Sequence, residues 1–232
     1  MSLRDLAKKL AGRAFPTDFY ERLVAHAALQ HQYAQVARTE RVASRQALWE
    51  QCIRALGADE PLLMLEFGVW QGESIRFFSE RLRHPESRFY GFDSFAGLPE
   101  EWGRLAKGTF DTAGSIPVIA DPRVAFVKGW FQNTFDAAVT AAKRDTSGHA
   151  TVLVHFDADL YSSTLFLLSK LYAEFDRYWF VFDEFTGHET RALLNFQQAY
   201  GAEVEFLGHA EARFPEQVFG KLDNRRGAYE PR

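Results

Sequence analysis

The chain is organised around one apolar stretch that ends in two carboxylates, Val152-Leu153-Val154-His155-Phe156-Asp157-Ala158-Asp159-Leu160-Tyr161-Ser162-Ser163-Thr164. A second apolar run, residues 178–182, ends in the acidic pair Asp183-Glu184. If the two runs are neighbouring parallel strands, their acidic groups meet at one edge of a sheet. The mutual repulsion of these groups would be unfavourable, so a bound cation or a proton-transfer task is the natural explanation.

Short apolar runs alternate with helical segments along the rest of the chain. The runs cover residues 62–68, 89–93, 124–127, 151–156 and 179–182, and helical character is found at 74–83, 135–143 and 164–175. Near-continuous apolar strands between helices are typical of a parallel sheet that is covered on both faces. Two further strands, expected as an antiparallel pair, follow at 204–207 and 217–222. We therefore predict a doubly wound α/β fold with a mostly parallel, seven-stranded sheet, in which ligands bind outside the carboxyl ends of the strands.

The N-terminal segment has a different pattern. Residues 3–11 place apolar side chains at helical spacing, and residues 19–56 contain neither proline nor glycine, which predicts one or two long helices ending near Gly57. We expect residues 1–58 to form a helical segment that packs on a main domain at 59–232. A structural cap, a lid over the site and a dimer surface are all compatible with this pattern.

Composition excludes several classes of protein. A chain of 232 residues with 47% apolar and 25% charged residues fits one sizeable domain with an extra segment, or at most two small domains. The formal charge of −4 provides no basic face for nucleic acid. Cys52 is the single cysteine, which excludes an internal disulfide and a thiolate metal cluster. Neither a secretory signal nor a membrane-spanning run is apparent, so we expect a cytoplasmic protein.

A glycine-containing turn, Glu66-Phe67-Gly68-Val69-Trp70-Gln71-Gly72-Glu73-Ser74, follows the first apolar run and opens a helix. Gly68 permits a tight turn, and Gly72 lets the backbone approach a ligand. The dinucleotide fingerprint G-x-G-x-x-G is not satisfied, because Trp70 occupies its second glycine position. Asp93 ends the next apolar run, 21 residues after Gly72, where an acid can accept both hydroxyls of a ribose.

Four motifs follow one another in the chain: Glu66 to Gly72, Phe92 to Pro99, Arg123 to Phe131 and Asp157 to Thr164. In this order they resemble the macrocin O-methyltransferase family of class I methyltransferases. Members of that family use S-adenosylmethionine and a divalent metal to methylate hydroxyls on sugars and other natural-product scaffolds. The resemblance covers roughly residues 61–200 and implies a homo-oligomer as well as the fold.

The resemblance also assigns cofactor-binding residues to the ends of four strands. They are Glu66, Gly68 and Gly72 at the methionine portion, with Trp70 and Ser74 in the same turn; Asp93, Ser94 and Phe95 at the ribose; Gly129, Trp130 and Phe131 at the adenine; and Asp157, which either turns toward the cofactor side or caps the next helix.

The same resemblance implies a Mg²⁺ or other divalent cation at Asp159, Asp183 and Glu184. The family usually has two aspartates in the second pair, so the longer Glu184 is a departure, and whether it binds the metal is left open. A metal that binds the acceptor oxygen lowers the pKa of that hydroxyl. Asp159 itself, or His188 in a loop above the strand ends, would take the proton. His155 lies inside a predicted buried strand, and we interpret it as a core residue.

These observations predict an S-adenosylmethionine-dependent, divalent-metal-assisted O-methyltransferase that acts on a hydroxyl of a sugar or natural-product-like small molecule. We expect no nucleic-acid partner, no membrane insertion and a homo-oligomer. Two alternatives stay open: a non-catalytic or differently specialised cofactor-binding member of the same fold, and an NAD- or nucleotide-binding α/β enzyme.

Overall fold

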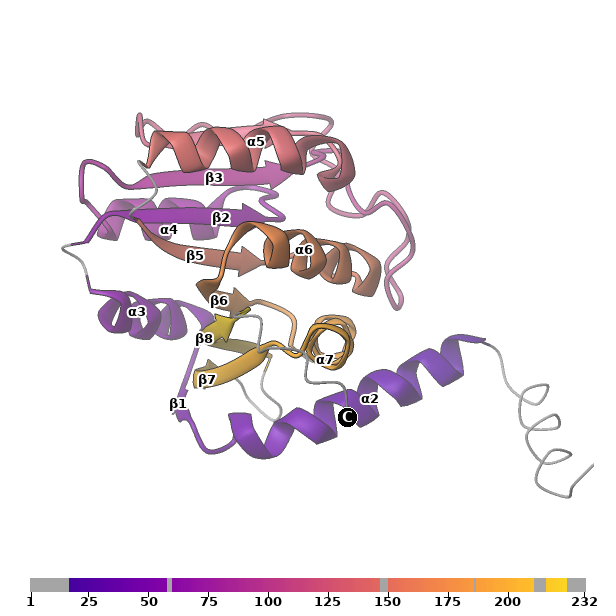
Figure 1. Ribbon diagram of the computed structural model, residues 1–232. Helices are drawn as coiled ribbons and strands as arrows, with labels where there is room; N and C mark the ends of the chain where they lie inside the picture. The colour runs from indigo at the N-terminus through magenta and orange to yellow at the C-terminus, as the bar shows by residue number, and fades with distance from the viewer. Residues whose placement is uncertain (1–16, 58–59, 147–149, 186, 211–215, 225–232) are drawn as a thin grey trace, which may run out of the picture.

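Eight strands form a single sheet in the part of the chain that the computed structural model describes, residues 17–57, 60–146, 150–185, 187–210 and 216–224. The strands are β1 (Glu40–Val42), β2 (Leu62–Phe67), β3 (Arg88–Asp93), β4 (Val124–Lys128), β5 (Thr151–Phe156), β6 (Arg177–Phe182), β7 (Glu203–Ala210) and β8 (Gln217–Asp223). The helices are α2 (Thr17–Val36), α3 (Arg45–Leu56), α4 (Glu73–Arg81), α5 (Phe131–Asp145), α6 (Tyr161–Glu174) and α7 (His188–Tyr200). Helices flank the sheet on both faces, which confirms the doubly wound α/β fold (Figure 1). The predicted count of seven strands was wrong, because β1 adds an eighth strand to the described part of the sheet.

The order of the strands places a crevice between β2 and β5. The sheet runs β1-β7-β8-β6-β5-β2-β3-β4, and β8 is antiparallel to both of its neighbours whereas the other pairs are parallel. From β2 the chain continues outward to β3 and β4, and from β5 it continues in the opposite direction to β6. Ligands bind outside the carboxyl ends of the strands at such a switch point. The predicted antiparallel pair at the end of the chain is also confirmed.

Strand β1 corrects the helical interpretation of residues 19–56. The segment forms two helices, α2 and α3, but residues between them leave the helix and pair in parallel with Gly208–Ala210 of β7. The absence of proline and glycine permits a helix without requiring one, and pairing with a distant edge strand overrides the local preference.

The ends of helix α3 follow from local capping. The side chain of Ser44 accepts a hydrogen bond from the Ala47 N–H and caps the first turn. Gly57 ends the helix with a positive φ of 81°, as predicted, and its N–H bonds to Ile53. The helix expected at residues 3–11 lies outside the described residues.

Two apolar cores lie on opposite faces of the sheet because strand side chains alternate. Leu63, Leu65 and Phe67 of β2 pack in the core beneath α5, α6 and α7, whereas Leu62 and Met64 pack in the core beneath α3 and α4. Every residue of β2 is buried, so this strand forms a rigid base for the crevice. Each fully buried leucine or phenylalanine stabilises the fold by roughly 1.5–3 kcal/mol.

Helix α2 lies along α7 and β7 at the far end of the sheet from β4 (Figure 1). The side-chain amide of Gln32 in α2 donates to that of Gln197 in α7 at 3.1 Å. The role of this segment as a cap, a lid or a dimer surface stays a prediction. Within the described residues, no helix is long and apolar enough to cross a membrane.

Candidate active site at the switch point

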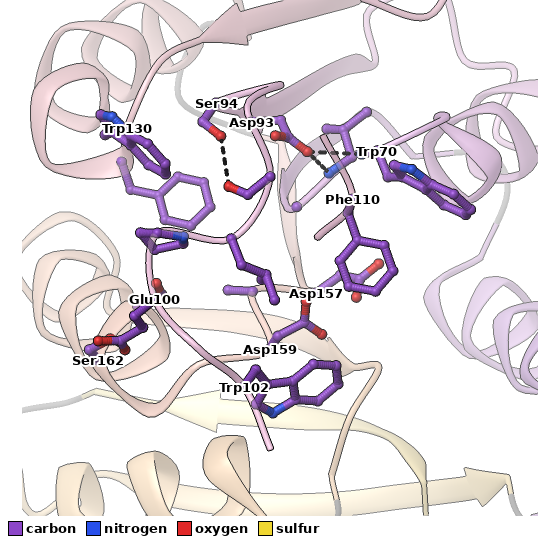
Figure 2. Close-up of a pocket in the computed structure, with 18 of the residues that line it drawn as sticks. Trp70, Asp93, Ser94, Glu100, Trp102, Phe110, Trp130, Asp157, Asp159 and Ser162 are labelled. Carbon is purple, nitrogen blue, oxygen red and sulfur yellow. Dashed lines mark hydrogen bonds between the residues drawn. The ribbon is translucent and has the colours of Figure 1, made fainter. Parts of the chain in front are cut away.

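A cavity of about 410 Å³ opens beyond the carboxyl ends of β2, β3, β5 and β6. Its wall is built by the turns that follow these strands, by the start of α3 and by the long connection between β3 and β4, residues 94–123. Figure 2 shows Asp93, Ser94 and Trp130 on one side of this cavity and Asp159 and Trp102 on the other. Its size is typical of a site for a small organic ligand.

Most of the residues expected to bind the cofactor line this cavity. They are Gly68, Trp70, Asp93, Ser94, Gly129, Trp130, Phe131 and Asp157. The other four predicted residues are not part of its wall: Glu66, Gly72, Ser74 and Phe95. Glu66, Ser74 and Phe95 are buried, so these side chains support the wall from behind.

The carboxylate of Asp93 holds the turns after β2 and β3 together. Its Oδ2 accepts the N–H groups of Val69 and Trp70, each at 2.8 Å, and its Oδ1 accepts the N–H of Phe95 at 2.7 Å. Two of these bonds are drawn in Figure 2. Two carboxylate oxygens offer about four acceptor sites, so Oδ1 keeps one for a ligand hydroxyl.

Gly68 is required by the close approach of β2 and β5. Its φ is +96°, and an added Cβ would lie 1.8 Å from the carbonyl oxygen of Asp157. Backbone bonds from Gly68 to Phe92 and from Asp157 to Phe67, each 2.9 Å, fix the three strand ends at this point. The backbone geometry therefore leaves no room for a side chain here.

Three residues of the cavity wall have unusual backbone conformations. Trp70, Phe110 and Asp159 have φ values of 47°, 69° and 59°. Such a left-handed conformation is uncommon for residues other than glycine and costs about 1–3 kcal/mol where it is strained. Strained residues of this kind cluster at functional sites, which supports a functional reading of the cavity.

The acidic residues expected at the strand ends share the same wall. Asp157 and Asp159 follow β5, and Asp183 and Glu184 follow β6. Burial, then the neighbouring Asp183 and then Asp93 together raise the pKa of Asp159 to about 7. Burial, followed by Asp183 and Asp159, likewise raises the pKa of Glu184 to about 7. The pKa of Asp157 is raised by burial and then by Asp183 and Asp159.

Glu189 is a further acidic residue of this cluster, and the sequence pattern did not predict it. It lies in the first turn of α7, is fully buried, and accepts the backbone N–H of Glu184 at 3.1 Å. Burial and then Asp159 raise its pKa well above the ordinary range. The helical spacing of Ala192, Leu193 and Phe196 predicts the helix that carries it.

The structure corrects the expected position of His188. The residue does not lie in a loop: it is the first residue of α7, and it is absent from the described wall of the cavity. Its Nδ1 accepts the backbone N–H of Tyr161 at 3.3 Å. His188 therefore ties the start of α7 to the start of α6, and its assignment as a proton acceptor stays a prediction.

His155 is buried, as its interpretation as a core residue predicted. Its Nδ1 lies 3.3 Å from Oε2 of Glu66, and its Nε2 lies 4.0 Å from Oδ1 of Asp183. Burial raises the pKa of Glu66, and the hydrogen bond to His155 opposes that rise.

The chemistry of the donors fits a divalent cation. Asp159, Asp183 and Glu184 offer the carboxylate oxygens that Mg²⁺ prefers, and the buried Oδ1 of Asp183 has no hydrogen-bond partner in the described structure. In the part of the chain that the structure describes, however, no group of three or more His, Cys, Asp or Glu side chains is arranged to hold a metal ion.

Comparisons with known proteins agree with the fold. No protein-family model matches the chain. A curated relative from Streptomyces olivaceus, 8-demethyl-8-(2,3-dimethoxy-alpha-L-rhamnosyl)-tetracenomycin-C 4'-O-methyltransferase, is 29% identical over 148 residues, 53% of this chain and 52% of the relative. The chain thus matches this relative over about half of its length. The structure of the O-methyltransferase NovP superimposes with a TM-score of 0.53 at 18% identity, covering 88% of this chain and 98% of NovP. The chain therefore has the fold of this O-methyltransferase, in agreement with the predicted Rossmann-like α/β fold.

Proposed function

We propose that the chain is an S-adenosylmethionine-dependent O-methyltransferase that methylates a hydroxyl of a sugar or natural-product-like small molecule. One observation carries the proposal: Gly68, Asp93 and the acidic residues Asp159 and Asp183 meet at one cavity at the switch point of the sheet. The fold of NovP and the sequence similarity to a methyltransferase named for a rhamnosyl-bearing substrate support it.

The cofactor fits the side of the cavity formed by β2, β3 and β4. Asp93 keeps an acceptor site for a ribose hydroxyl, and Gly68 lets the ends of β2 and β5 approach each other at the floor of the crevice. Trp130 and Phe131 open α5 on the same wall and would flank an adenine ring. The acidic wall near Asp157 suits the ammonium group of a bound amino acid.

The acceptor fits the opposite side, under the connection between β3 and β4. Trp102 of this connection lines the cavity on that side, and Phe110 lines it next to Trp70, with 5.7 Å between the two ring centroids. Glu100 accepts a hydrogen bond from the Ser162 hydroxyl at 2.7 Å and so attaches the connection to α6. Apolar rings beside acidic groups suit a molecule that carries hydroxyls on an otherwise apolar scaffold.

When bound, S-adenosylmethionine supplies an electrophilic methyl group. The protein must position the acceptor oxygen against it and remove the hydroxyl proton, because an alcohol is a poor nucleophile at neutral pH. The Asp159 carboxylate lines the cavity on the acceptor side, opposite Asp93 (Figure 2), and would accept that proton. The backbone hydrogen bonds at Gly68 and Asp157 fix the strand ends, and with them the position of the cofactor side of the cavity relative to the acceptor side.

We further propose assistance by a divalent cation, held by Asp159 and Asp183 with or without Glu184. Such an ion supplies a Lewis acid that lowers the pKa of the acceptor hydroxyl. The chemistry of the donors and the unpartnered Oδ1 of Asp183 support this part of the proposal. We also propose that the protein works as a homo-oligomer in the cytoplasm, which light scattering and cell fractionation test.

Two measurements test the function in sequence. Isothermal titration with S-adenosylhomocysteine should show one site per chain, and NAD should not displace the ligand. Transfer of a labelled methyl group from S-adenosylmethionine is then followed over a panel of rhamnosides and hydroxylated polyketides. Binding of NAD in place of S-adenosylhomocysteine would refute the function. Full turnover in excess chelator would refute the metal but keep the methyltransferase.

A further inference from the structure

Arg45 is the one basic residue among the described residues that line the cavity. The same wall carries six acidic residues: Asp93, Glu100, Asp157, Asp159, Asp183 and Glu184. A single guanidinium in an acidic cavity is an unusual composition, because acidic surroundings alone would repel any anionic part of a ligand. The position of this cation therefore indicates where such a part can bind.

The guanidinium stands between the glycine turn and the end of β6. Arg45 opens α3, and its Nη2 pairs with Glu73, the first residue of α4. The amide of Gln46 donates to the other oxygen of Glu73 at 3.0 Å. Nη1 of Arg45 points the other way, toward Oδ2 of Asp183 at 3.7 Å.

The donors on Nη1 remain available to a ligand. A separation of 3.7 Å is an ion pair but lies beyond hydrogen-bond distance, so Asp183 does not occupy these donors. The Arg45 side chain is 37% exposed and lines the cavity. The contact of the guanidinium with the Trp49 ring, at 5.3 Å, limits its orientation.

The methionine portion of S-adenosylmethionine carries charges of both signs. Its ammonium and sulfonium groups are attracted by the acidic wall, whereas its carboxylate is repelled by that wall and needs a cation. A guanidinium matches a carboxylate with two parallel N–H bonds. We propose that Arg45 receives the carboxylate of the cofactor's methionine portion, so that helix α3, which precedes β2 in the chain, completes the cofactor site. This inference rests on the proposed function.

The test uses two ligands that differ in one group, S-adenosylhomocysteine and its decarboxylated analogue. Isothermal titration of the full chain should show that the wild type binds the carboxylate-bearing ligand roughly 10- to 150-fold more tightly. In Arg45→Gln the two affinities should come within about threefold of one another. Arg45→Lys keeps the charge but not the planar guanidinium, so its preference for the carboxylate-bearing ligand should lie between those of the wild type and Arg45→Gln. This variant also provides the test if Arg45→Gln does not fold.

Glu73→Gln is the matched control. It removes the same ion pair between α3 and α4 but leaves the guanidinium, so the preference for the carboxylate should persist. If Arg45 only fastened the two helices, Glu73→Gln and Arg45→Gln would lose affinity for both ligands alike, and that result would overturn the inference. An unchanged preference in Arg45→Gln would overturn it while leaving the proposed function intact. Failure of the wild type to bind either ligand would overturn both.

Discussion

Replacing Asp93 by Asn tests whether its carboxylate both holds the cavity wall and binds the cofactor ribose. The native carboxylate accepts three backbone N–H groups, from Val69, Trp70 and Phe95. Asn offers one acceptor oxygen, and its NH₂ group can only donate. With the oxygen at the Oδ2 position, the bond to Phe95 is lost; with the oxygen at Oδ1, the bonds to Val69 and Trp70 are lost.

The expected magnitude follows from this count. A hydrogen bond to a charged group contributes roughly 1.5–3 kcal/mol, so the free energy of unfolding should fall by about 2–5 kcal/mol. For a chain of this size, 1 kcal/mol shifts the melting temperature by about 2–4 °C, which predicts a fall of roughly 4–20 °C. Because the NH₂ group also removes the acceptor for a ribose hydroxyl, the affinity for S-adenosylhomocysteine should fall about tenfold or more.

Thermal unfolding and isothermal titration measure the two effects separately, and Asp111→Asn provides the control. Asp111 accepts the backbone N–H of Ala113 at 2.7 Å in the same connection, but it does not line the cavity. This control should lose some stability and keep its affinity for S-adenosylhomocysteine. If Asp93→Asn melts like the wild type and binds S-adenosylhomocysteine within twofold, Asp93 neither fastens the wall nor holds the cofactor.

Three further predictions follow from other contacts. Asp159→Asn, which suits the same left-handed backbone, should abolish methyl transfer and keep S-adenosylhomocysteine binding; substantial turnover would exclude Asp159 as the base. Arg123 donates to three backbone carbonyls near the end of α4 and pairs with Asp121. Arg123→Met should therefore lower the free energy of unfolding, measured by urea denaturation, by on the order of 3 kcal/mol. Arg123→Lys should lower it by less. Burial and then the hydrogen bond to Asp145 raise the pKa of Tyr90 to about 12. An unfolded tyrosine ionises near pH 10, so the stability that the protonated Tyr90 contributes is complete below pH 10 and is lost as pH rises to about 12. Tyr90→Phe should flatten this loss of stability between pH 10 and about 12. A variant whose stability follows the same pH profile as the wild type would contradict the raised pKa of Tyr90.

The sequence predicts those strands whose position follows from a local run of apolar residues. Strands β2, β3, β5 and β6 are buried apolar runs that end at glycine or acidic residues, and each lies where the pattern predicts it. Their mostly parallel arrangement follows from the helices between them. The placement of the acidic residues at one sheet edge then follows from chain direction alone, because parallel strands end on the same side.

Strand β1 shows what local pattern leaves out. Residues 40–42 are a strand because their backbone pairs with the exposed edge of β7, far away in the chain. The buried position of Glu189 depends in the same way on tertiary packing, because it is set by how α7 meets the corner after β6. Neither the strand at residues 40–42 nor the burial of Glu189 can be predicted from the few residues on either side of it.

The cluster of acidic residues at the sheet edge can be explained differently once the groups around it are known. From the sequence, the repulsion among Asp157, Asp159, Asp183 and Glu184 required a cation or a proton-transfer task. The structure supplies one cation from the chain, Arg45, which lies 3.7 Å from Asp183 and lowers the cost of ionising Glu184. A bound S-adenosylmethionine would add its own positive charges to the same wall. Repulsion therefore predicts positive charge at this edge without specifying a metal, and the dependence of turnover on a divalent ion has to be measured against both of these other cations.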